Sequence, residues 1–312
     1  MAIGAVVAHR IAPALLAWFA ENNRATLPWR TDRAPYRIVI SEFMLQQTQV
    51  DRVVPLFEAF VARWPTFAAL SAASQADVVR AWKGLGYNSR AVRLHALARV
   101  VCEKYAGELP RDDASLRALP GIGPYTARAI AAFAFDADVV AIDTNIRRIV
   151  HRTQFGLEWP PLATPAEIDA VASSLVPPGG GFAFNSALMD LGATLCTARA
   201  PKCLLCPLAR GCVAAPIDAA TLARRAAAHA RIRTPQEKMK FEETDRFVRG
   251  RVIDRLRTLG ADETISLLDL HAELAPGLSE SHRDGAAFAA IVARLGRDGI
   301  VEVDEASVAL KA

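Results

Sequence analysis

The chain has 312 residues, of which 52% are hydrophobic and 22% are charged, and its formal net charge is +4. A chain of this length predicts about two domains, and its composition is apolar enough to bury a sizeable core. No uninterrupted apolar run reaches the ~18 residues that a membrane-spanning helix needs, so we expect no membrane partner.

The first 23 residues predict an amphipathic helix. They lack the basic start of a secretory signal, and His9 and Arg10 interrupt their apolar character. The chain has five cysteines, four of them in one cluster, which fits a reducing compartment. The fifth, Cys102, lies in a helical pattern, and we interpret it as a buried, inert thiol.

Residues 30–225 predict a mostly α-helical unit in which short polar segments separate the helices. Residues 35–64 predict one or two helices punctuated by Pro55. Residues 74–105 predict two more, which are broken at the Gly-Leu-Gly sequence of residues 84–86.

A glycine-rich turn follows the next helical pattern. Residues 119–127 read LPGIGPYTA, which places Gly121 and Gly123 in a tight turn between two helices. Glycine permits left-handed backbone angles and a close approach that a larger residue would block. The free N–H groups at the start of the second helix can bind a phosphate oxygen. The full pattern is typical of helix-hairpin-helix DNA-binding proteins, although an ordinary helix–helix turn can also contain Gly-x-Gly.

Asp143 emerges from the apolar run 139–142 and is followed by a helical pattern. At the start of a helix, the helix field stabilises a carboxylate. An acidic N-cap is common by itself, so the meaning of Asp143 depends on the motifs around it.

Four cysteines lie close together further along the chain. Cys196, Cys203, Cys206 and Cys212 are separated by six, two and five residues. Four thiolates on short loops can hold an iron–sulfur cluster or a zinc ion. Structural zinc sites usually have two tight pairs, whereas here a single pair is flanked by two lone cysteines. The spacing therefore favours a 4Fe–4S cluster over zinc.

The last part of the chain predicts a separate unit. Residues 226–240 are interpreted as a linker, and residues 241–312 predict three helices and a hairpin of two strands, which resembles a winged helix-turn-helix. Residues 1–230 carry a net charge of +6, which suits a polyanionic partner, whereas residues 231–312 carry −2. We expect the last unit to dock on the rest of the chain or to make a few specific contacts.

Together these motifs indicate a family. The turn, Asp143 and the cysteines make about residues 10–215 resemble the helix-hairpin-helix DNA glycosylases of the endonuclease III superfamily. The SEFMLQQTQ sequence at 41–49 and the LPWR sequence at 27–30 narrow the resemblance to adenine DNA glycosylases of the MutY type.

The fold that this resemblance implies is mostly α, with a two-lobed core over residues 1–225 that binds DNA in a cleft. Its six-helix lobe would span about 31–135, and its cluster lobe would combine the N-terminal helix with about 136–225. The small winged-helix-like domain at 241–312 follows the core.

The resemblance also implies the chemistry, which is cleavage of an N-glycosidic bond in double-stranded DNA. Glu42 would protonate the leaving adenine, and Asp143 would stabilise or attack the oxocarbenium-like sugar. Tyr125 and Asn145 would orient these carboxylates. Bifunctional relatives have a lysine at the position of Tyr125, and tyrosine forms no imine with the sugar, so we expect no β-lyase activity.

Contacts with DNA are implied in the same way. Tyr87, in a GLGY sequence, would wedge into the duplex and offset the cost of base flipping. Gln46 lies in the segment that would fill the gap left by the flipped adenine. The alternative role for Tyr87 and Gln46 is packing between helices. Arg199 and Lys202 are candidate phosphate contacts or solvated charges. The full set predicted for DNA or base binding is Leu27, Trp29, Arg30, Gln46, Gln47, Thr48, Tyr87, Gly121, Gly123, Arg199 and Lys202.

Residues 241–312 depart from the family pattern. The usual bacterial member has a Nudix-like domain here that reads 8-oxoguanine, and this segment is too short and is patterned differently. The sequence does not choose between 8-oxoguanine and guanine as the base opposite adenine. We expect a monomer that acts on duplexes with a mismatched or oxidised base pair, in the cytoplasm at the nucleoid.

Two other functions fit parts of the pattern. A thymine or uracil mismatch glycosylase of the same superfamily can also carry tyrosine after the hairpin, but the QQTQ segment argues against it. A non-catalytic iron–sulfur DNA-binding regulator would use the last unit as its reader, but it would not need both Glu42 and Asp143.

Overall fold

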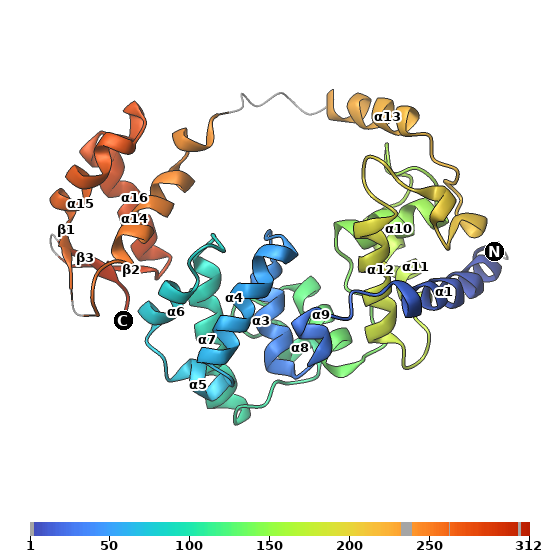
Figure 1. The fold of residues 1–312 in the computed structure, drawn as a ribbon, viewed down its shortest axis with the longest axis horizontal. Coiled ribbons are helices and arrows are strands. Elements are labelled where there is room, and N and C mark those ends of the chain that lie inside the picture. Colours follow the sequence, from blue (N-terminus) through green and yellow to red (C-terminus); the bar gives the residue numbers. More distant parts are fainter. Residues whose placement is uncertain (1–2, 232–238, 262, 305–306) are drawn as a thin grey trace. The chain divides into compact units, whose positions relative to one another are not determined.

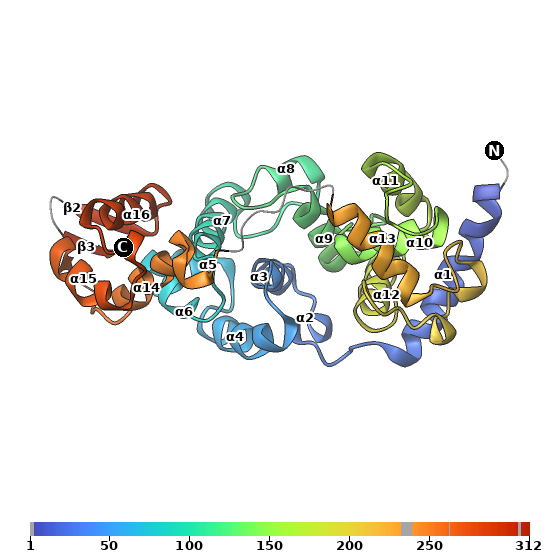
Figure 2. The same cartoon turned by 90° about the horizontal axis from the view of Figure 1, so that it is seen from above.

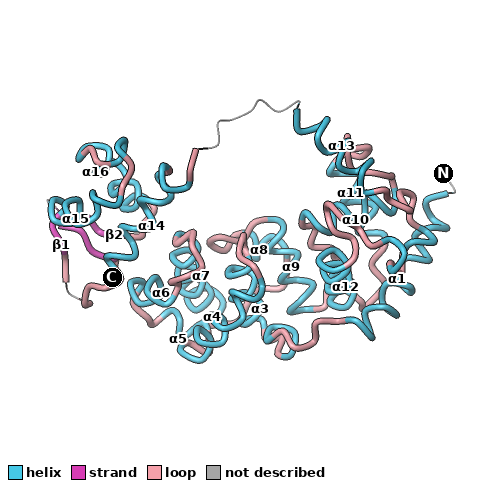
Figure 3. The backbone as a smooth tube through the Cα atoms, turned by 45° about the horizontal axis from the view of Figure 1, so that its top comes forward, coloured by secondary structure: helices cyan, strands magenta, loops and turns pink. Residues whose placement is uncertain are grey.

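The computed structural model describes residues 3–231, 239–261, 263–304 and 307–312. The described chain is mostly helical, as the sequence predicts, and its strands all lie near the C-terminus (Figures 1 and 3). It divides into two compact units. Unit 1 comprises residues 1–42, 111–118 and 122–235, and unit 2 comprises residues 43–110, 119–121 and 236–312. None of the described helices has the length and hydropathy to cross a membrane.

Unit 1 is built around one central helix. Its helices are α1 (Ile3–Asn22), α2 (Pro28–Thr31), most of α3 (Pro35–Leu45), α8 (Asp113–Arg117), α9 (Pro124–Phe135), α10 (Thr144–Gln154), α11 (Pro165–Ser174), α12 (Gly181–Thr194), the 3-10 turns η1 (Cys203–Leu205) and η2 (Ala209–Gly211), and α13 (Ala219–Arg231). Helices α1, α9 and α10 all pack on α12 (Figure 2). Leu15, Ile149, Phe184 and Leu191 are buried in the core that these helices share.

A buried carboxylate joins the N-terminal segment to this central helix. Asp190 of α12 is fully buried and accepts hydrogen bonds from Arg24 Nε at 2.5 Å and from Arg30 Nη1 at 2.6 Å. A buried charge is tolerated only when it is paired in this way. The segment between α1 and α2 is therefore fixed to α12 by charge as well as by packing.

Unit 2 combines a group of helices with the C-terminal domain. Its elements are α4 (Val50–Arg63), α5 (Phe67–Ser71), α6 (Gln75–Ala81), α7 (Ser89–Tyr105), η3 (Phe241–Glu243), α14 (Asp245–Leu256), β1 (Ile265–Ser266), α15 (Leu267–Leu274), η4 (Ala275–Gly277), η5 (Glu280–His282), α16 (Gly285–Arg297), β2 (Val301–Asp304) and β3 (Ser307–Leu310). Helix α7 packs on α5 and α6, and α6 also contacts β3.

The C-terminal domain has the element order of a winged helix, as predicted. The hairpin of β2 and β3 is antiparallel, with Val301 opposite Leu310. Strand β1, which the sequence did not predict, pairs with β3 on its other side through Ile265 and Val308. Of the predicted linker, residues 226–231 belong to α13, and residues 232–238 lie outside the described residues.

Two local predictions were wrong. The helical stretch of residues 35–64 breaks at residues 46–49 and not at Pro55, which lies within α4. Gln47 there has a left-handed φ of 56°, which an α-helix does not contain, whereas α4 continues through Pro55. Cys102 is partly buried and not fully buried, because it is adjacent in α7 to Val101, the residue that faces the core.

Candidate active site

Glu42 is a buried acid near the end of α3, with 8% of its surface exposed. Its neighbours Ser41 and Phe43 are buried as well. The pKa of Glu42 is raised to about 7, chiefly by burial and also by the nearby charge of Asp143, while a hydrogen bond with the Tyr125 side chain acts in the opposite direction. An ordinary glutamate is ionised at neutral pH, whereas this one keeps a proton on a substantial fraction of molecules.

Asp143 is the N-cap of α10. Its Oδ1 accepts from the backbone N–H of Ile146 at 2.7 Å, and its Oδ2 accepts from Asn145 Nδ2 at 3.0 Å. The preceding segment is fixed by the buried Asn185 of α12, whose Oδ1 accepts from the Ala141 N–H at 2.9 Å. The carboxylate is therefore held in one orientation by its own helix and by α12.

Tyr125 lies in the first turn of α9 and bonds to Glu42, and burial raises the pKa of its hydroxyl. Its pKa is also raised by the charges of Glu42 and Asp143. The structure thus brings together four residues that the sequence predicts for catalysis: Glu42, Tyr125, Asp143 and Asn145. They come from the end of α3, the start of α9 and the start of α10.

Arg148 of α10 is a residue that the sequence analysis did not identify. Its Nη2 donates to Asn145 Oδ1 at 3.0 Å and to the Gly192 carbonyl at 2.9 Å, and its Nε donates to the Cys196 carbonyl at 2.8 Å. It therefore connects the carboxylate of Asp143, through Asn145, with the first cysteine of the cluster. The only signal in the sequence is its spacing of three residues from Asn145, which places both on one helix face.

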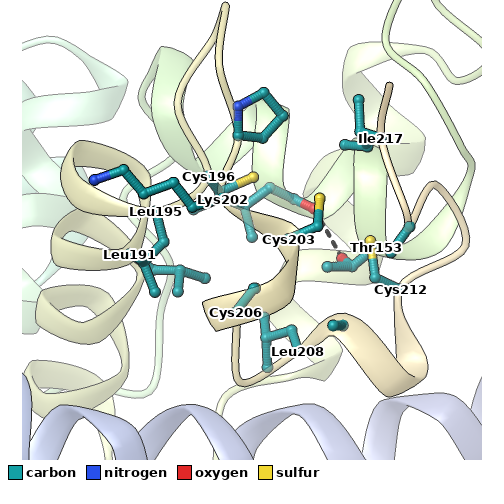
Figure 4. A pocket seen from close by; sticks show the side chains of 14 residues that line it. Thr153, Leu191, Leu195, Cys196, Lys202, Cys203, Cys206, Leu208, Cys212 and Ile217 are labelled. Atoms are coloured by element: carbon teal, nitrogen blue, oxygen red, sulfur yellow. Dashed lines mark hydrogen bonds between the residues drawn. The ribbon is translucent and has the colours of Figure 1, made fainter. Parts of the chain in front are cut away.

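The four clustered cysteines line one cavity between α10, α12 and the loops after α12 (Figure 4). Each of them, Cys196, Cys203, Cys206 and Cys212, is free and partly buried. The described residues contain no group of three or more His, Cys, Asp or Glu side chains arranged to hold a metal ion. All four predicted thiols nevertheless line this one cavity.

A buried cation stands beside these thiols. Arg152 is completely buried, and its Nη1 lies 3.6 Å from Cys196 Sγ and donates to the Thr197 carbonyl at 2.8 Å. Glu158 accepts from Arg152 Nε at 2.7 Å, and the Arg152 carbonyl accepts from Cys212 Sγ at 3.3 Å. A guanidinium in contact with sulfur fits a group of thiolates that would carry negative charge.

The glycine turn has the conformation expected from its sequence. Gly121 has φ of 80°, and a Cβ added there would lie 2.9 Å from the ring of Phe43, so both the backbone angle and the space require glycine. Gly123 is the N-cap of α9, and Pro124 is the first residue of the helix. Helices α8 and α9 pack on each other across this turn.

Arg90 of α7 joins two segments that the sequence predicts to contact DNA. It is 5% exposed, and it donates to the carbonyl of Gln46 at 2.6 Å and to Thr48 Oγ1 at 3.3 Å. On the other segment it donates to the carbonyls of Leu85 at 2.8 Å and Gly86 at 3.1 Å. Burial lowers its pKa to about 10. Sequence reasoning missed Arg90 because its bonds to the carbonyl of Gln46 and to Thr48 cross more than forty residues of the chain.

The residues predicted to contact DNA differ in how far they are exposed to solvent. Leu27 is the N-cap of α2, and Trp29 is buried. Only 9% of the Arg30 side chain is exposed, because Asp190 binds it. Gln47, Tyr87, Arg199 and Lys202 are exposed, and Tyr87, like Gln47, has a left-handed φ, here 46°.

Comparison with known proteins shows the family to which the chain belongs. Residues 40–178 match the family described as HhH-GPD superfamily base excision DNA repair protein. The chain is 44% identical over 259 residues to the adenine DNA glycosylase of Mycolicibacterium smegmatis, with 82% of this chain and 83% of that protein covered. It is 42% identical over 262 residues to the adenine DNA glycosylase of Mycobacterium tuberculosis, with 82% and 81% covered.

A solved structure of a thermostable thymine-DNA glycosylase is also similar. It matches with a TM-score of 0.62 and 31% sequence identity, covering 67% of this chain and 96% of that one. The chain therefore belongs to the HhH-GPD superfamily of base excision DNA repair proteins and, within it, to the adenine DNA glycosylases.

Proposed function

We propose that this protein excises adenine that is mispaired with 8-oxoguanine or guanine in double-stranded DNA. The observation that carries the proposal is a buried Glu42 with a pKa of about 7, bonded to Tyr125 and close enough to Asp143 to feel its charge. When two carboxyl groups lie in different environments, one can stay protonated and act as an acid while the other stays ionised. We propose adenine as the excised base because the chain is similar to adenine DNA glycosylases.

Each carboxyl group has one part in this mechanism. Glu42 donates its proton to a ring nitrogen of adenine, so that the base leaves as a neutral molecule when the C–N bond breaks. Asp143 stabilises the positive charge that develops on the sugar. Water then adds to the sugar, and the Glu42 carboxylate takes the proton of that water, which restores the acid.

A panel of duplexes tests this proposal. We expect alkali-revealed strand breaks at adenine opposite 8-oxoguanine and opposite guanine, and none at adenine opposite thymine. Release of thymine or uracil from mismatches with guanine, without release of adenine, would overturn the proposal in favour of the related mismatch activity.

DNA binding is assigned to the glycine turn and to the two segments that Arg90 joins. Gly121 and Gly123 would present backbone N–H groups at the start of α9 to a phosphate. Tyr87 would wedge into the duplex, and Gln46, Gln47 and Thr48 would occupy the space that adenine leaves. For Arg30 we propose a positioning role, because Asp190 already binds its guanidinium. Arg199 and Lys202, both exposed, remain the proposed phosphate contacts of the cysteine loop.

A 4Fe–4S cluster is the cofactor that we propose for the four cysteines. Cys196, Cys203, Cys206 and Cys212 line one cavity, and the buried Arg152 beside them, which also pairs with Glu158, would donate a hydrogen bond to the Cys196 sulfur. When bound, the cluster would cross-link the loop that carries Arg199 and Lys202, and so it would support DNA binding rather than the chemical step.

The purified protein is expected to be brown and to contain about four iron atoms per chain. Cys203→Ser should lose most of the iron and bind duplex DNA more weakly, because one ligand of the loop is removed. Cys102→Ser is the matched control, since Cys102 lies on α7 in unit 2 and outside this cavity. Iron and zinc contents are measured by elemental analysis; stoichiometric zinc without iron would contradict the assignment.

The enzyme is expected to leave an intact abasic strand. Tyr125 provides no amine to form an imine with the sugar, so borohydride should trap no covalent adduct with the wild-type protein. Tyr125→Lys places an amine at the same position and should give some trapped product, measured as a slowly migrating band on a denaturing gel. A trapped adduct with the wild type would show that another residue acts as a nucleophile and that the enzyme has lyase activity.

A further inference from the structure

The C-terminal domain contacts the loop that carries Tyr87. Arg246, in the first turn of α14, places its guanidinium carbon 4.1 Å from the centre of the Tyr87 ring. This tyrosine is 38% exposed and has a left-handed backbone angle, so its ring is presented to solvent by a loop that is costly to form. Through Arg246 the C-terminal domain therefore contacts this ring.

A second arginine, at the C-terminal end of α14, binds the same loop. Arg257 Nη2 donates to Asn88 Oδ1 at 2.6 Å and to the Val79 carbonyl at 3.1 Å, and its side chain is 8% exposed. Gln75 Nε2 adds a bond of 2.6 Å to the Gly299 carbonyl. These contacts join the C-terminal domain to α6 and to the loop that follows it.

Arg246 lies between two aromatic rings of unit 2. Its guanidinium carbon also lies 5.7 Å from the ring centre of Phe241, which is 54% exposed. A guanidinium that is attracted to both ring faces links the Tyr87 ring to the start of α14 and restrains its orientation. The domain's net negative charge, by contrast, argues against a broad phosphate-binding surface.

We propose that Arg246 is a positioning residue for Tyr87, so that the C-terminal domain takes part in sensing the base opposite adenine. Arg257 fixes the loop, and Arg246 holds the ring in the orientation in which it enters the duplex. This inference rests on the proposed function, because it requires Tyr87 to act as the wedge. The C-terminal domain then acts on the opposite base indirectly, through Tyr87, and does not bind that base itself.

Binding selectivity tests the proposal. The quantity measured is the ratio of two dissociation constants, for a fully paired duplex and for the same duplex with adenine opposite 8-oxoguanine. All proteins carry Asp143→Asn so that the duplex stays intact. Arg246→Ala should lower this ratio about two- to fivefold, which corresponds to the ~0.5–1 kcal/mol of an exposed cation–π contact.

Two variants serve as matched controls. Arg249→Ala removes an arginine one turn further along α14 that pairs with Asp298, and it should leave the ratio unchanged. Arg246→Lys keeps a cation at the same position and should retain part of the selectivity. An equal loss of affinity for both duplexes in Arg246→Ala would show a plain phosphate contact and would overturn the proposal, as would no loss at all.

A double-mutant cycle asks whether Arg246 acts through the ring. In a Tyr87→Ala background, Arg246→Ala should cause no further loss of selectivity; a full additional loss would mean that Arg246 contacts DNA independently and would refute the positioning role. Failure of the proposed function would look different. The wild type would release no adenine, while Arg246 and Tyr87 would still show an interaction energy in the binding ratio. A wild-type ratio of one would overturn the inference directly.

Discussion

Asp143→Asn is expected to lower the single-turnover rate of adenine excision by about 10²–10³-fold, the effect of removing one electrostatic group that stabilises a transition state. The amide preserves the shape of the side chain but supplies no negative charge to the sugar cation. Because asparagine caps helices about as well as aspartate, α10 should remain folded. Dissociation constants for mismatched duplex should therefore change little, and the loss should appear in the chemical step.

The control for Asp143→Asn is Asp284→Asn, the same substitution at another helix N-cap. Asp284 Oδ1 accepts from the Ala287 N–H at 2.9 Å at the start of α16. This variant should excise adenine at the wild-type rate. If Asp143→Asn keeps more than about a tenth of the wild-type rate, the sugar cation is stabilised elsewhere and Asp143 is only a cap.

Glu42→Gln is expected to lower the excision rate by about 10²–10⁴-fold, because the amide has no proton to give to the leaving base. The wild-type rate should itself depend on pH. With a pKa of about 7, Glu42 is protonated below that value, so the rate should fall about tenfold per pH unit above it. Glu58→Gln, on the exposed face of α4, is the control and should keep the wild-type rate and profile.

The same substitution should raise stability in alkaline solution. The pKa of Glu42 is about 7 in the folded protein, against 4.5 for a glutamate free in water, so the unfolded chain holds fewer protons between these values and stability falls as pH rises through that window. The total cost above pH 7 is of order 3 kcal/mol, at about 1.4 kcal/mol per pKa unit. Glu42→Gln removes this cost, so denaturant unfolding should show a more stable variant at pH 8 and little difference at pH 4. A variant less stable than wild type at pH 8 would contradict the burial of a protonatable acid.

Local patterns in the sequence predicted most of the helices, and the glycine turn with its two helices, because these depend on neighbouring residues. The same is true of the hairpin of β2 and β3, which alternates apolar and polar residues. Strand β1 was missed because a pair of residues such as Ile265 and Ser266 carries no periodicity. The break before α4 was misplaced because Gln47 adopts its left-handed angle in a setting organised by Arg90, which is distant in the sequence.

In the candidate site, too, the features set by neighbouring residues were predicted and those set by distant residues were not. The SEFMLQQTQ motif indicated Glu42 as the acid, and the apolar run before Asp143 with the helical pattern after it suggested its place at a helix start. The residues that hold these groups could not be found in this way. Arg90, Arg148 and Asp190 each bond to at least one partner far along the chain, and each resembles an ordinary helix charge until the fold brings that partner beside it.

Arg148 has one further consequence, for the interpretation of natural or engineered variants. Its guanidinium bonds both to Asn145, the partner of Asp143, and to the backbone of Cys196. A substitution at this position would weaken the cysteine loop and loosen the carboxylate in a single event. Activity alone would then fail to tell a cofactor defect from a catalytic one, so any variant at residue 148 has to be classified by its iron content as well as by its rate.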